Sequence, residues 1–230
     1  MTRTVSRRPW RCSLAALLLA ACGTRATPDG AEPPDSAASD PNLQGEVDEA
    51  PLLAAAGPAV WREGGLLVIR PTGGPPIELR DDSSDVSEGY RIHRYDGRIE
   101  RTAFHTVHLS LWESAAALLV HDSTGRVAVL AARPLPSPSG ARLAVGQLDL
   151  EAQMMPNVLQ LYRVDGDRLV EEYAVEPTDW GPAELAWVHE DTLALARMVV
   201  SSRGPGDYDR VPARLVRGAR GWTLTDRSEQ

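Results

Sequence analysis

Short runs of apolar residues, rich in Val, Leu, Trp and Tyr, alternate with clusters of Gly, Pro, Asp and Ser from about residue 58 to the end of the chain. Within 104–112 the apolar and polar positions alternate one by one, which is the pattern of a strand with one buried face. No stretch keeps a helical apolar period beyond two turns. The pattern therefore predicts an all-β globular domain over residues 58–230, with few helices.

Three β-hairpins are predicted within this domain. They join the apolar runs 118–121 and 127–131, 158–164 and 169–175, and 183–188 and 192–199. The second hairpin turns at Asp165-Gly166-Asp167. An Asp-Gly pair between two alternating runs favours a tight turn, because both central positions of such a turn take positive φ.

The β-rich segments also repeat along the chain. The turn aspartates Asp122 and Asp165 stand 43 residues apart, and the blades of β-propellers repeat every ~40–45 residues. The stretch Ser137-Pro138-Ser139-Gly140-Ala141-Arg142-Leu143-Ala144 resembles the Ser-Pro-Asp-Gly repeat of the WD40-like propellers of periplasmic Tol-type proteins, with Ser139 in the usual place of Asp. The resemblance implies a small or incomplete β-propeller-like array of antiparallel meanders. A two-sheet β-sandwich is the alternative.

The first 22 residues carry the pattern of an export signal. A basic start without acids precedes an apolar run over 14–21, and this run is too short to span a bilayer, which takes about 20 apolar residues. Leu19-Ala20-Ala21-Cys22 resembles the lipobox of bacterial lipoproteins, in which the bond before the Cys is cut and the thiol carries a diacylglycerol. The resemblance implies a signal peptide over residues 1–21 and lipidation of Cys22.

The lipobox also implies a location. In enteric bacteria an Asp directly after the lipidated Cys favours retention at the inner membrane, and Gly23 stands there in this chain. We therefore expect a lipid anchor in the outer membrane, with the protein facing the periplasm. Ser6-Arg7-Arg8-Pro9-Trp10 resembles the twin-arginine export motif, so that route and the general secretory route both stay open. Cys12 is lost with the signal, which leaves the mature chain no thiol for a disulfide or a thiolate metal site.

Residues 22–57 are predicted to form a disordered acidic tether. Residues 23–57 have seven acids, a single Arg and almost no large apolar residue, so they have little to bury. A flexible coil of this length averages about 30–35 Å from end to end. The domain is therefore expected to contact the membrane through its N-terminal lipid.

The charged residues of the chain limit the classes of partner that it can bind. The formal net charge is −8, and all 24 basic side chains are Arg. No basic stripe is present outside the signal, which argues against nucleic acid. Without Lys the chain cannot form a lysine Schiff base or a P-loop phosphate clamp. We expect a protein partner in the cell envelope and no cofactor.

Few residues show a pattern of catalysis or metal binding. His105 and His108 are three positions apart on an expected strand, which sends them to opposite faces. His189-Glu190 lacks the second His of a zinc-protease motif, and no Gly-x-Ser-x-Gly elbow occurs. No metal site and no catalytic residue is therefore predicted.

Other polar residues fit loops and turns. Ser137 and Ser139 are better explained as turn residues than as nucleophiles. Asp149 and Glu151 are chemically suited to calcium, but they lack a calcium-loop pattern and fit a solvated loop better.

The tryptophans are the remaining candidates for a functional role. The sequence has a single Phe, so the domain core must contain several of the tryptophans at 112, 180, 187 and 222. Any of them left exposed would mark a binding face, and Trp180 and Trp187 are the candidate partner-binding residues. These features favour a non-catalytic binding or assembly module. The alternative is an envelope hydrolase whose Ser/His/Asp or carboxylate-pair site is assembled from loops around His105 or His121.

Overall fold

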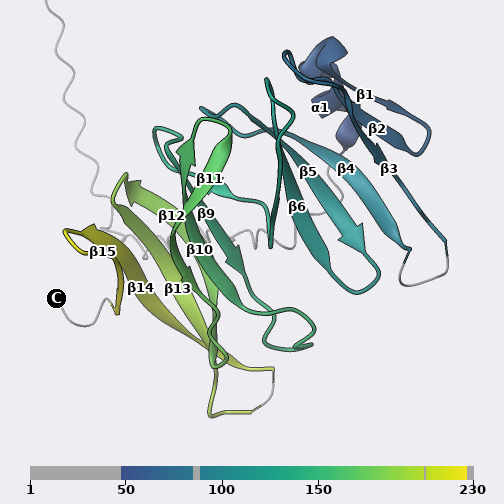
Figure 1. Cartoon of the computed structure of the whole chain (residues 1–230). Coiled ribbons are helices and arrows are strands. Elements are labelled where there is room, and N and C mark those ends of the chain that lie inside the picture. Colours follow the sequence, from purple (N-terminus) through teal and green to yellow (C-terminus); the bar gives the residue numbers. More distant parts are fainter. Residues whose placement is uncertain (1–47, 85–88, 205, 227–230) are drawn as a thin grey trace, which may run out of the picture. The chain divides into compact units, whose positions relative to one another are not determined.

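The computed structural model describes residues 48–84, 89–204 and 206–226. The expected signal peptide, Cys22 and most of the expected tether lie outside the described residues. Within the described part, every regular element is a β-strand except the helix α1 (Glu49–Ala56) and the 3₁₀ turn η1 (Gly57–Ala59) (Figure 1). The prediction of an all-β domain is confirmed.

The strands form four antiparallel sheets, each made of strands that are consecutive in the sequence. Sheet A contains β1 (Val60–Glu63), β2 (Leu66–Ile69) and β3 (Ile77–Arg80). Sheet B contains β4 (Arg91–Arg98), β5 (Phe104–Leu111), β6 (Ala115–His121) and β7 (Val127–Leu130). Sheet C contains β8 (Leu135–Pro136), β9 (Arg142–Gln147), β10 (Val158–Asp165) and β11 (Arg168–Val175). Sheet D contains β12 (Trp180–His189), β13 (Thr192–Val200), β14 (Tyr208–Gly218) and β15 (Gly221–Asp226). The expected array of antiparallel meanders is confirmed, in place of the two-sheet sandwich.

The three predicted hairpins are present as β6–β7, β10–β11 and β12–β13. At the second hairpin Asp165 pairs with Arg168, and Gly166 between them has a φ of 60°. The prediction that both central residues of this turn take positive φ is wrong, because Asp167 does not. Asp167 instead accepts a hydrogen bond from Nε of Arg126 at 2.9 Å, which links sheet C to sheet B.

Apolar side chains fill the space between consecutive sheets in three clusters. Successive side chains of a strand point to opposite faces, so sheet B contributes to two of them. In β6, for example, Leu118 packs into the cluster shared with sheet A, and Leu119 packs into the cluster shared with sheet C. Sheets C and D share the third cluster, in which Leu161 and Leu215 are fully buried.

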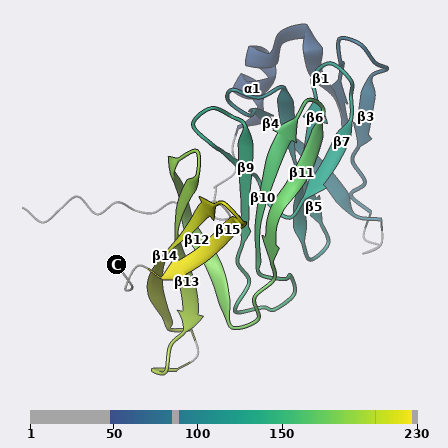
Figure 2. The ribbon, with the colours of Figure 1, turned by 60° about the vertical axis from the view of Figure 1, so that its left-hand side comes forward.

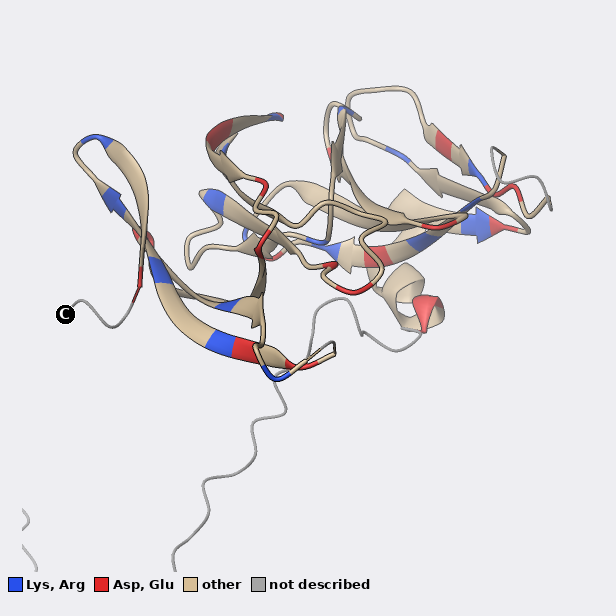
Figure 3. Cartoon of the chain, turned by 90° about the horizontal axis from the view of Figure 1, so that it is seen from below, with Lys and Arg blue, Asp and Glu red and all other residues tan. Residues whose placement is uncertain are grey.

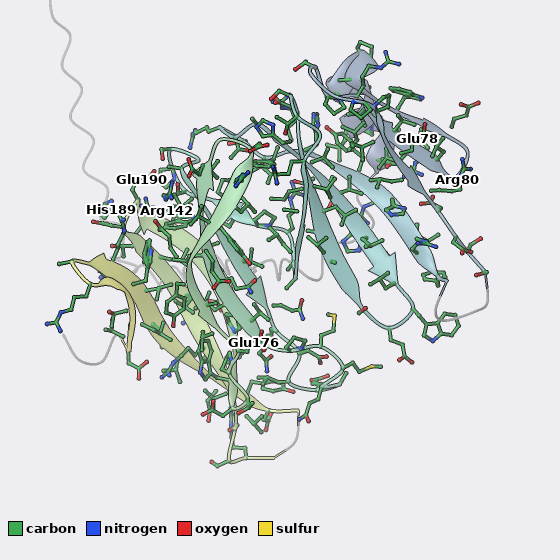
Figure 4. The ribbon with its side chains drawn as sticks, in the orientation of Figure 1. Glu78, Arg80, Arg142, Glu176, His189 and Glu190 are labelled. Carbon is green, nitrogen blue, oxygen red and sulfur yellow. The ribbon has the colours of Figure 1, made fainter. Side chains whose placement is uncertain are left out.

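Polar contacts join the turns between the first two strands of sheets B, C and D. Arg101 of sheet B donates to the Pro138 carbonyl oxygen of sheet C at 2.5 Å. Ser137 of sheet C donates its hydroxyl to the Glu190 carboxylate of sheet D at 2.9 Å. Arg142, beside Glu190 in Figure 4, donates to the Glu190 backbone carbonyl at 3.5 Å. The Ser-Pro-Ser-Gly motif therefore forms a turn that connects three sheets.

The helix α1 belongs to the packed domain, although the composition of its residues predicts a tether. Its N-terminus is capped by the Asp48 carboxylate, which accepts from the backbone N–H of Ala50. Leu52 packs against the cluster between sheets A and B. Glu49 forms a two-point ion pair with Arg62 of β1, at 2.7 and 2.9 Å. Residues 49–56, which the sequence assigns to the tether, therefore contact β1, β4 and the cluster between sheets A and B.

Candidate functional site

Trp180 and Trp187, the candidate partner-binding residues, lie in the cluster between sheets C and D. Trp180 is 8% exposed. Trp187 is partly buried and donates its indole N–H to the Leu135 carbonyl oxygen at 3.0 Å. Its ring meets the ring of Trp222 edge-on, with centroids 6.1 Å apart. These contacts favour a core role for both tryptophans over a binding role.

His105 and His108 face opposite sides of sheet B. His105 is buried and its Nδ1 lies 2.8 Å from the Tyr95 hydroxyl oxygen. Burial raises the pKa of Tyr95 to about 12, so this hydroxyl keeps its proton. His108 lies on the face toward sheet C and lines a cleft between the two sheets. The first histidine stabilises the core, and the second is available to a ligand.

His121 caps a turn. Its Nδ1 lies 3.2 Å from the hydroxyl oxygens of Ser123 and Thr124 in the turn between β6 and β7. The neighbouring Asp122 carboxylate forms an ion pair with Arg98 at 2.6 Å. A hydrolase triad needs the imidazole between the serine and the carboxylate, and the contacts of His121 and Asp122 do not have that arrangement.

Asp149 organises the loop between β9 and β10. Its two carboxylate oxygens accept hydrogen bonds from the backbone N–H groups of residues 152–155, at 2.8 to 3.1 Å. Burial alone would raise the pKa of Asp149, but these four hydrogen bonds lower it overall. Both oxygens of the Asp149 carboxylate are therefore occupied by hydrogen bonds within its own loop. No group of three or more His, Cys, Asp or Glu side chains suited to a metal ion occurs in residues 48–84, 89–204 and 206–226.

A cleft of about 310 Å³ opens between sheets B and C. Its walls come from β4, β5, β6, the segment after β7, the end of β9 and the loop that follows β9. The lining residues are Arg94, Asp96, His108, Ala115, Ala116, Ala131, Ala132, Arg133, Gln147, Leu148, Asp149 and Met155. The cleft therefore combines a charged group of residues with a wall of small apolar side chains.

The charged group is centred on Asp96. This carboxylate is the extra residue of a β-bulge between Tyr95 and Gly97, and the whole residue is 4% exposed. Bulges redirect side chains at functional surfaces. Nε of Arg94 donates to Asp96 at 3.1 Å. Burial and the positive charge of Arg94 lower the pKa of His108, although Asp96 opposes this effect, so the imidazole is neutral at pH 7.

An apolar rim, defined here as Tyr90, Trp112 and Met154, lies on segments that adjoin the lining of the cleft in the sequence. Trp112 is 52% exposed and Met154 is 56% exposed. The ring of Tyr90 meets that of Trp112 edge-on, with centroids 6.0 Å apart. Trp112 stands in the turn that leads into the wall of the cleft at Ala115, and Met154 precedes the lining residue Met155. The two loops lie at the same lower end of their sheets in Figures 1 and 2.

Arg94, Asp96 and Arg133 are not among the residues that the sequence pattern predicts. They come from separate segments, and no motif marks them. The available signal was an acid followed by glycine inside a charge-rich strand, which is the composition of a bulge rather than of a regular strand. Figure 3 shows Arg and acidic residues interspersed along the described strands, so charge density did not point to one site either.

No family model, no curated protein and no solved structure matches this chain. Among the described residues, no helix has the length and apolar character needed to cross a membrane. The function must therefore be inferred from the geometry of the chain itself.

Proposed function

We propose that this protein is a membrane-anchored lipoprotein of the bacterial envelope and acts as a non-catalytic binding module for an envelope protein. Cys22 carries the lipid, and the domain faces the periplasm from the outer membrane. The observation that supports the binding role is the exposed Trp112, which meets Tyr90 edge-on and lies in the turn that leads to the cleft residue Ala115. Aromatic residues and Met are enriched at protein interfaces, where a few aromatic anchors contribute most of the affinity.

We further propose that the four meanders are blades of an incomplete β-propeller. Consecutive sheets share an apolar cluster, as neighbouring blades do, and the first turns of sheets B, C and D are linked through Arg101, Ser137 and Glu190. Sheet A has three strands where the others have four, and α1 contacts both β1 and β4. This arrangement supports an array that starts at α1.

The lipid anchor is tested with Cys22→Ser. We expect the variant to lose its acyl chains by mass spectrometry and to leave the membrane fraction after a high-salt wash. A protein that stays firmly bound to membranes without acylation contradicts the lipoprotein assignment.

The binding role is tested by affinity capture from envelope extract, with the full chain in non-ionic detergent as bait. We expect Trp112→Ala to lose a partner that the parent retains. Val129→Ala is the matched control, because Val129 is an exposed apolar residue of β7 at 66% exposure. If both variants capture the same proteins as the parent, the apolar rim is not the binding surface.

A further inference from the structure

Most polar groups in the cleft between sheets B and C already have partners within the protein. Both oxygens of Asp149 are bonded to the backbone of its own loop, and Gln147 donates its side-chain amide to the Pro156 carbonyl oxygen at 2.9 Å. One oxygen of Asp96 accepts from Arg94. In the part of the chain that the structure describes, Arg133, His108 and the terminal nitrogens of Arg94 have no such partner. These are the groups left to hold a ligand.

The unpaired Arg donors favour an anion of low charge as the ligand of this cleft. Arg94 and Asp96 compensate each other as an ion pair at 3.1 Å, and His108 is neutral at pH 7. Arg133 is exposed and has no ion-pair partner among the described residues, while the ionised Asp149 also lines the cleft, so the cleft as a whole carries no net charge. A phosphate dianion would bring a second negative charge close to the buried Asp96, which is unfavourable at short range. A carboxylate carries a single charge and matches the planar fork of a guanidinium.

Small and apolar residues line the rest of the cleft. Ala115 and Ala116 of β6 and Ala131 and Ala132 after β7 line it from sheet B, the sheet that also carries Arg94, Asp96 and His108. Leu148 and Met155 line it from the loop after β9. The volume of about 310 Å³ lies at the small end of ligand pockets. The space therefore suits a short aliphatic group rather than a large ring system.

We propose that this cleft binds a carboxylate attached to a short aliphatic body, with Arg133 and the terminal N–H groups of Arg94 as donors and the four alanines as the apolar wall. The same chemistry is presented by a small branched acid and by the C-terminal residue of a peptide. The proposal rests on the proposed binding role, because the segments of the apolar rim adjoin the lining of the cleft, where a bound partner would insert such a group.

The experiment measures binding to the full chain in non-ionic detergent by titration calorimetry. The probes are isocaproate, its amide, inorganic phosphate, and the peptide acetyl-Ala-Ala-Leu with a free or an amidated C-terminus. Arg133→Gln removes a charged donor of the cleft at an exposed position. The matched control is Arg220→Gln, an exposed Arg in the turn between β14 and β15.

We expect the carboxylate probes to bind about tenfold or more tightly than their amides, and Arg133→Gln to remove this difference, since a hydrogen bond to a charged group is lost. Arg220→Gln should bind like the parent. Binding of isocaproate as tightly as the peptide indicates a free acid, and binding of the peptide alone indicates a chain end.

Three results would overturn the proposal: equal affinity for acids and amides, tighter binding of phosphate than of carboxylates, or unchanged binding in Arg133→Gln. Failure to bind any probe also overturns it. Capture of a partner through Trp112 does not depend on Arg133, so capture that persists alongside any of these results rejects the carboxylate and keeps the binding role.

Discussion

Gly140→Ala offers a direct test of the contact between sheets B and C. Gly140 ends the turn between β8 and β9 with a φ of 77°. A Cβ at this position would lie 2.8 Å from the carbonyl carbon of Arg101 and closer still to its oxygen. Both neighbours are backbone atoms, which cannot rotate away. The turn must therefore separate from sheet B, and the hydrogen bond from Arg101 to Pro138 is lost with it.

The magnitude follows from two contributions. A non-glycine residue at positive φ costs roughly 1–2 kcal/mol, and forcing extra atoms into a packed contact costs about 1–3 kcal/mol more. We therefore expect Gly140→Ala to lower the free energy of unfolding by about 2–5 kcal/mol. That is a large share of the roughly 5–15 kcal/mol that holds a typical domain.

Gly166→Ala is the matched control. Gly166 has a φ of 60° and a Cβ there would meet nothing within 4 Å, so only the backbone cost of about 1–2 kcal/mol applies. Urea unfolding of both variants, followed by far-ultraviolet circular dichroism, measures the difference. If the two variants lose equal stability, the turn of sheet C does not approach Arg101 as closely as the structure has it, and the reasoning fails.

Three further predictions concern the core, the helix and the cleft. Trp187→Ala should lower the free energy of unfolding by about 3 kcal/mol, measured from urea midpoints; an unchanged midpoint would place this indole at the surface. Leu52→Ala should cost about 2 kcal/mol, because α1 packs against sheets A and B; no loss of stability would show that α1 does not pack against these sheets. The affinity for isocaproate should rise as the pH falls, because the bound anion raises the pKa of His108, which burial and Arg94 lower in the free protein. The affinity should begin to rise as the pH falls below the pKa of His108 in the complex, and it should level off below the pKa of His108 in the free protein. Calorimetry at constant ionic strength from pH 8 to 5 measures this profile. A flat profile would remove His108 from the site.

The local pattern of the sequence was sufficient for the class of the domain and for its hairpins. Alternating runs around Asp122 and around Gly166 predict paired strands, because register and turn chemistry depend on neighbours in the sequence. The Ser-Pro-Ser-Gly motif likewise predicts a turn. The hydrogen bond from Ser137 of this motif to Glu190, 53 residues later, could not be predicted from the sequence. Nothing in the residues around a glutamate indicates which distant hydroxyl will donate to it.

Only the tertiary structure determined which apolar residues are exposed at the surface and which are buried. Trp112 and Trp187 are the same residue type in similar apolar stretches, yet the first ends in an exposed turn and the second packs between two sheets. The helix α1 forms from a short run of Leu and Ala and is stabilised by Glu49 reaching Arg62 across 13 residues. Arg94 and Arg133 share a cleft only because sheets B and C pack together. The sequence by itself determined elements whose contacts are local; the site arises from contacts between elements, and these form only when the sheets bury their shared faces.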